Sequence, residues 1–137
     1  MAISYHQGRL IDHVHLRVTD MQKSRAFYRA VLQALGRLDA YGEGEGFFYA
    51  DELYVDGATE RPSKVHLAFQ ARSMEEVQRF HRAGIAAGGT DNGAPGPRNY
   101  HPTYYAAFVL DPDGNNIEAV YHGPTERSAE SLFIRRP

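Results

Sequence analysis

The chain has 137 residues, the length of one ordinary domain, and its 42% hydrophobic and 23% charged residues are typical of globular proteins. The net charge of −2 argues against nucleic acid as a partner, and the lack of a long apolar run or signal-peptide pattern argues against membrane insertion and predicts a cytoplasmic protein. Because cysteine is absent, any bound metal must use His, Asp, Glu or water, and a disulfide framework is excluded.

The first part of the chain predicts a strand, a helix and further short strands. Residues 10–18 alternate, so that the side chains of His13, His15 and Arg17 share one face of a strand. A helix is expected from Met21 to about Leu35, capped by Thr19 or Asp20 and ended by Gly36. Aromatic runs at 47–49 and 53–55 predict two short antiparallel strands.

The second part of the chain repeats this order. Residues 65–70 alternate, and Ser73 with Glu76 forms a capping box for a helix that ends at 88–89. Residues 89–103 contain three prolines and are expected to form a long functional loop. Strands are predicted at 104–110 and 116–121, joined by an Asp-Pro turn at 111–115.

The two halves are related by a gapless repeat with an offset of 53 residues (66 minus 13). The matched pairs are His13 with His66, Leu16 with Phe69, Phe27 with Phe80, Arg29 with Arg82, Ala34 with Ala87, and Gly36 with Gly89. A repeat of this length indicates two copies of one motif, each too small to bury its own core. If the copies pack symmetrically, the two histidines can meet across the join.

Three residues are candidate metal ligands. His13 and His66 are equivalent in the repeat, and alternation places Glu118 on a comparable face of the last strand. Two imidazoles and one carboxylate leave coordination positions open for water or substrate, which is typical of a catalytic rather than a structural metal site.

The sequence resembles the vicinal oxygen chelate superfamily, which includes glyoxalases, bleomycin-resistance proteins and ring-cleaving dioxygenases. The resemblance covers about residues 9–122 and is carried by residues 13–20 (HVHLRVTD), Phe27-Tyr28, residues 66–69 (HLAF) and residues 111–118 (DPDGNNIE). It implies an α+β fold with two βαβββ modules, at about 9–56 and 64–122 of a single domain. These modules form an open, cup-shaped mixed β-sheet with the helices outside. The family's metal ligands fall on His13, His66 and Glu118, and the expected cofactor is one divalent ion: Fe, Zn, Ni or Mn.

The same resemblance suggests substrate-binding and catalytic residues. Arg17 lies where glyoxalases keep an arginine, and His101 lies where ring-cleaving dioxygenases keep a histidine that serves as acid or base. Glu118 is a second candidate base. His15, Tyr104 and Phe108 are expected to line the substrate pocket. The chain departs from both patterns, because the glyoxalases' fourth ligand falls near Phe48 and the dioxygenases' tyrosine is replaced by Phe108.

Two classes of function therefore stay open. The first is a metal-dependent enzyme acting on a small oxygenated substrate, by glyoxalase-like lyase or isomerase chemistry or by dioxygenase chemistry. The second is a metal-free drug-binding protein of the bleomycin-resistance type. Either is expected to be a homodimer, because short modules with open sheets are stabilised by pairing. The sequence leaves open whether one chain forms one cup or modules from different chains combine.

Overall fold

The first module is a four-stranded sheet with one helix. The computed structural model describes residues 3–57 and 59–137. Its first module contains β1 (Val14–Val18), α1 (Met21–Ala34), the 3-10 turn η1 (Leu38–Ala40), β2 (Tyr41–Gly44), β3 (Phe47–Ala50) and β4 (Leu53–Gly57). The strand order is β1-β4-β3-β2, hereafter sheet A, with β1 parallel to β4 and the other pairs antiparallel.

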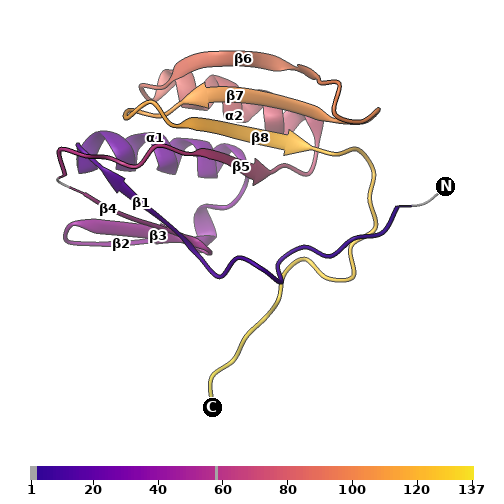
Figure 1. The fold of residues 1–137 in the computed structure, drawn as a ribbon, viewed down its shortest axis with the longest axis horizontal. Coiled ribbons are helices and arrows are strands. Elements are labelled where there is room, and N and C mark those ends of the chain that lie inside the picture. Colours follow the sequence, from indigo (N-terminus) through magenta and orange to yellow (C-terminus); the bar gives the residue numbers. More distant parts are fainter. Residues whose placement is uncertain (1–2, 58) are drawn as a thin grey trace.

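The second module repeats this arrangement. It contains β5 (His66–Gln70), α2 (Met74–Ala86), β6 (Thr90–Pro97), β7 (Tyr105–Leu110) and β8 (Asn116–Tyr121). The strand order is β5-β8-β7-β6, hereafter sheet B, with β5 parallel to β8. The α+β fold with two βαβββ modules and open mixed sheets is therefore confirmed, and the two sheets are separate, with sheet B in the upper part of the view and sheet A at the lower left (Figure 1).

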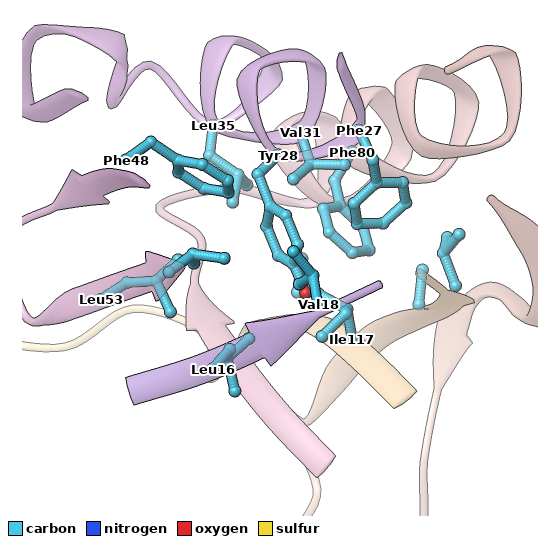
Figure 2. Close-up of a cluster of buried hydrophobic side chains, with 14 of the residues drawn as sticks. Leu16, Val18, Phe27, Tyr28, Val31, Leu35, Phe48, Leu53, Phe80 and Ile117 are labelled. Carbon is cyan, nitrogen blue, oxygen red and sulfur yellow. The ribbon is translucent and has the colours of Figure 1, made fainter. Parts of the chain in front are cut away.

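One hydrophobic core joins the modules. Phe27 and Val31 of α1 are fully buried, as are Phe80 of α2 and Val109 of β7. These side chains belong to one cluster with buried residues of β1, β3, β4 and β8 (Figure 2). Because each helix buries its apolar stripe in this shared cluster, neither module has a separate core.

The Asp-Pro turn attaches the second module to the first. The Asp111 carboxylate is buried and accepts hydrogen bonds from the backbone N–H groups of Asp113 and Asn115 and from the Asn115 side chain. It also accepts one from the Tyr28 hydroxyl on α1, at 2.5 Å. Thr19, which follows β1, donates to the Asp113 carboxylate. The turn motif therefore holds the two modules together as well as reversing the chain.

Two sequence-based boundaries are wrong. Residues 90–97, expected to be loop, form β6 with two register shifts, and residues 10–13 lie outside β1. The strand tolerates its glycines and prolines because it lies at the sheet edge, where one row of backbone groups needs no ladder partner. Arg98 donates to the carbonyl oxygens of Ala94, Gly96 and Pro97 and stabilises this irregular segment.

The described residues include no helix that is both long enough and apolar enough to cross a bilayer.

Candidate functional site

The predicted site residues divide between the outward faces of the two sheets. His13, His15 and Arg17 lie on or just before β1, while Leu16 and Val18 point into the core. On sheet B, Ile117 and Ala119 point into the core, so Glu118 faces the opposite way. The alternation predicted for both strands is confirmed.

His66 and Glu118 lie together on sheet B. Parallel pairing places His66 beside Asn116 and Ala68 beside Glu118. Because Ala68 is small, the imidazole lies within reach of the carboxylate, and His66 Nε2 is 3.0 Å from Glu118 Oε1. Glu118 is only 2% exposed, so this carboxylate is held in a site from which most water is excluded.

The other nitrogen of His66 defines the chemistry of this pair. Nδ1 lies 3.1 Å from the carbonyl oxygen of Asn116, so Nδ1 carries the hydrogen and donates it. In the neutral ring, Nε2 is then an acceptor that faces the acceptor Oε1 of Glu118. A proton or a metal cation between these two atoms removes the repulsion. A histidine that donates its other N–H to a backbone carbonyl is the usual arrangement for a metal ligand.

Tyr104 contacts the second carboxylate oxygen of Glu118. Its hydroxyl donates a hydrogen bond to Glu118 Oε2. Burial, followed by the hydrogen bond and the charge of Glu118, raises the pKa of Tyr104 well above its usual value, so this hydroxyl keeps its proton. Phe108 pairs with Glu118 across β7 and β8, and its ring centroid lies 6.0 Å from that of His66. Tyr104 and Phe108 therefore border the His66–Glu118 pair.

His101 reaches the same region through His122. His101 Nε2 is 2.8 Å from His122 Nδ1, and both rings pack against Tyr104. The backbone N–H of Thr103 donates to His101 Nδ1, so the hydrogen of the neutral ring is on Nε2 and is donated to His122. Burial, and then the charge of His101, lowers the pKa of His122. His101 and His122 therefore form a hydrogen-bonded pair of imidazoles beside Tyr104.

The residues of β1 form a second polar group on sheet A. His13 Nδ1 is 2.6 Å from Asp12 Oδ1, and His15 Nε2 is 2.8 Å from Asp56 Oδ1. Arg17 Nε lies 3.8 Å from the same Asp56 oxygen. All of these groups are at least one-third exposed. His15 and Arg17 are therefore held by one carboxylate on the face that His13 borders.

The single chain does not bring all three predicted ligands together. Within residues 3–57 and 59–137, no group of three or more His, Asp or Glu side chains is placed to hold a metal ion. His66 and Glu118 are adjacent, whereas His13 lies with sheet A. The three-ligand set consequently stays a prediction.

Sequence reasoning missed two residues of these groups. His122 was not selected as a site residue, yet it is the partner of His101; its even spacing from Glu118 was the available signal. Asp56 gave no local signal, because its position opposite Arg17 depends on the parallel pairing of β1 with β4.

Comparisons with known proteins agree with this fold. Residues 10–119 match the family model described as "Glyoxalase/Bleomycin resistance protein/Dioxygenase superfamily". A glyoxalase/bleomycin resistance protein from Albidiferax ferrireducens is 32% identical, with a TM-score of 0.63 over 80% of this chain and 95% of that one. A search of curated proteins finds no match.

More distant structures share the fold alone. A glyoxalase-related enzyme from Fulvimarina pelagi is 16% identical, with a TM-score of 0.66 over 93% of this chain and 99% of that one. A glyoxalase I mutant from Zea mays is 18% identical, with a TM-score of 0.56 over 80% of this chain and 43% of that one. The paired modules, their repeated histidines and the family match over residues 10–119 lead to one conclusion: the chain belongs to the glyoxalase/bleomycin resistance protein/dioxygenase superfamily.

Proposed function

We propose that this protein is a divalent-metal-dependent enzyme of the vicinal oxygen chelate type that acts on a small oxygenated substrate. The observation that carries the proposal is the approach of His66 Nε2 to within 3.0 Å of Glu118 Oε1, on a carboxylate that is almost fully buried. A cation at this position satisfies both atoms, and imidazole with carboxylate suits Fe, Zn, Ni or Mn.

In His13, as in His66, the Nδ1 atom lies within hydrogen-bond distance of an oxygen acceptor. The Nδ1 atom of His13 is engaged by Asp12, which leaves Nε2 with a free lone pair. The residues therefore fit a site made of His13, His66 and Glu118. Since His13 lies with the other sheet within one chain, we propose a homodimer in which His13 of one chain completes the site that His66 and Glu118 form in the other.

The remaining groups have roles that follow from their contacts. The bound ion supplies Lewis acidity toward adjacent oxygen atoms of the substrate. Arg17 offers a guanidinium for an anionic substrate group, and Tyr104 and Phe108 form an aromatic border. The His101–His122 pair accepts a proton from the substrate and returns it, as general acid–base chemistry requires.

The ligand set can be tested by metal titration of the metal-free protein. We expect about one divalent ion per chain, and a loss of affinity of about 100-fold or more in His66→Ala, Glu118→Gln and His13→Ala. His6→Ala is the matched control, since His6 is exposed and precedes β1. Bound iron would direct assays to dioxygenase substrates, whereas zinc, nickel or manganese would direct them to lyase and isomerase substrates. A wild-type protein that takes up no metal would contradict the proposal and favour metal-free small-molecule binding.

A further inference from the structure

Sheet A carries an unusual set of aromatic rings on its outward face. Cross-strand pairing arranges this face in two rows, His15-Tyr54-Tyr49-Gly42 and Arg17-Asp56-Phe47-Gly44. Phe47 and Tyr54 stack with centroids 5.9 Å apart and planes 16° apart, and His15 meets Tyr54 edge to face at 5.2 Å. We call Phe47, Tyr49 and Tyr54 the aromatic platform.

Two glycines of β2 explain why the rings lie flat. A Cβ atom on Gly42 would lie 2.3 Å from Tyr49 Oη and 2.4 Å from its Cζ. A Cβ atom on Gly44 would lie 2.4 Å from Phe47 Cε1. The rings of Tyr49 and Phe47 therefore rest directly on the backbone of β2, where any other residue would displace them. Tyr49 is still 46% exposed, so the side of its ring away from the sheet is accessible.

Tyr49 and Tyr54 of the platform line a hollow of about 470 Å³. The lining residues are His13, His15, Tyr49, Asp51, Glu52, Leu53 and Tyr54. This volume lies within the usual range for small-molecule sites. The lining combines flat aromatic and apolar surface with two carboxylates and contains neither lysine nor arginine.

The charge of the hollow selects among aromatic ligands. Asp51 and Glu52 are adjacent in the β3–β4 turn, where Asp51 has a positive φ of 47° that holds the turn tight. Burial raises the pKa of Asp51, the negative charges of Glu52 and Asp39 raise it further, and the positive charge of Arg37 acts against them. A cation relieves this repulsion and is also attracted to the face of a tyrosine ring.

We propose that the aromatic platform binds a planar aromatic group bearing a positive charge, with the ring stacked on Tyr49 and the charge near Asp51 and Glu52. The inference rests on the proposed function and names the part of the substrate that lies beside His13, a cationic ring, whereas the anionic group proposed for Arg17, which does not line the hollow, would be another part of the same substrate. Binding itself requires only sheet A and no metal ion, so it can be measured apart from the metal site.

The test uses three flat probes of similar size on the EDTA-treated full chain: N-methylquinolinium, neutral quinoline and anionic 2-naphthoate. Calorimetry is expected to show saturable binding of N-methylquinolinium below about 1 mM and clearly weaker binding of 2-naphthoate. Tyr49→Leu should weaken N-methylquinolinium binding about fivefold or more. Asp51→Asn combined with Glu52→Gln should abolish most of the preference for the cation.

Two further variants separate the geometry from general effects. Gly42→Ala removes no contact group but displaces the Tyr49 ring, and it should weaken binding by about threefold or more, even where Tyr49→Leu folds poorly. Tyr100→Leu alters a tyrosine beside sheet B that is even more exposed than Tyr49, and it should change nothing. The absence of saturable binding, equal binding of 2-naphthoate, or full affinity in Gly42→Ala would overturn the inference. Metal uptake without probe binding rejects the platform alone, whereas probe binding without metal uptake rejects the metal site alone.

Discussion

At the residue scale, the two buried carboxylates Asp111 and Glu118 have different roles. Asp111 is satisfied on both oxygens by its own turn and by Tyr28, so it has no capacity for chemistry. Glu118 is equally buried, but one of its oxygens faces His66 Nε2, which is itself an acceptor when the ring is neutral. A buried carboxylate whose partners are all donors stabilises a fold, whereas one that faces an acceptor needs a cation.

The Tyr28–Asp111 contact should contribute measurably to stability. Tyr28→Phe removes the hydroxyl that donates to a buried carboxylate, and we expect the free energy of unfolding to fall by about 1–3 kcal/mol. Urea denaturation measures the change. Tyr41→Phe is the control, because its hydroxyl donates to the exposed Glu43 and its loss should cost less than about 0.5 kcal/mol. Equal losses in the two variants would contradict the role assigned to Asp111.

Tyr104 should affect metal binding through Glu118. Tyr104→Phe removes the hydrogen bond that orients the carboxylate, and metal affinity is expected to fall by about 10–100-fold with the fold intact. Metal titration and thermal melting of the metal-free protein measure the two effects. Tyr105→Phe is the matched control, since its hydroxyl accepts from Gln78 on α2. If the two variants bound metal alike, Tyr104 would have no role in orienting Glu118.

At the scale of elements, the repeat is not uniform along its length. The helix N-caps Asp20 and Ser73 keep the offset of 53 (73 minus 20), but the left-handed glycines that follow the helices are Gly36 and Gly88, an offset of 52 (88 minus 36). The sequence alignment paired Gly36 with Gly89 instead. The structure shows that α2 is one residue shorter than α1, so Gly88 ends the helix and Gly89 has a separate task.

Gly89 is required by packing. A Cβ atom there would lie 2.5 Å from Val109 Cγ1, 2.7 Å from Phe27 Cε1 and 2.8 Å from the carbonyl oxygen of Gly84. Gly89→Ala is expected to lower the free energy of unfolding by about 1–3 kcal/mol, because the core cannot expand freely. Gly96→Ala meets only the Arg98 side chain at 3.4 Å and should cost less, as chemical denaturation can show. A Gly89→Ala variant as stable as the wild-type protein would mean that the core adapts to the added methyl group.

At the scale of the whole molecule, the open question is which chain supplies His13. Co-expression of a His13→Ala chain with a differently tagged Glu118→Gln chain, followed by tandem purification, isolates the mixed dimer. If sites combine residues from two chains, this dimer contains one intact site and should bind about one ion, whereas each parent homodimer should bind none. Sites within single chains would leave the mixed dimer without metal, and a monomeric protein would also contradict the shared site.

Much of the fold was predictable because local patterns specify it. Alternation identified both faces of β1 and β8, the capping residues located the starts of both helices, and the Asp-Pro motif located the turn before β8. The prediction failed at β6, where glycines and prolines suppress strand propensity and pairing with β7 overrides it. The cytoplasmic location and the homodimer stay predictions.

The sequence alone determined the two modules, the candidate histidines and the family, because periodicity, capping residues and motifs are local properties that can be recognised without knowledge of the tertiary contacts. Only the tertiary structure decided which candidates meet. It placed His66 against Glu118, His101 against His122 and Asp56 between His15 and Arg17, and it left His13 on the other sheet. These neighbours depend on which strands pair and in which register, and burial of one shared core selects both.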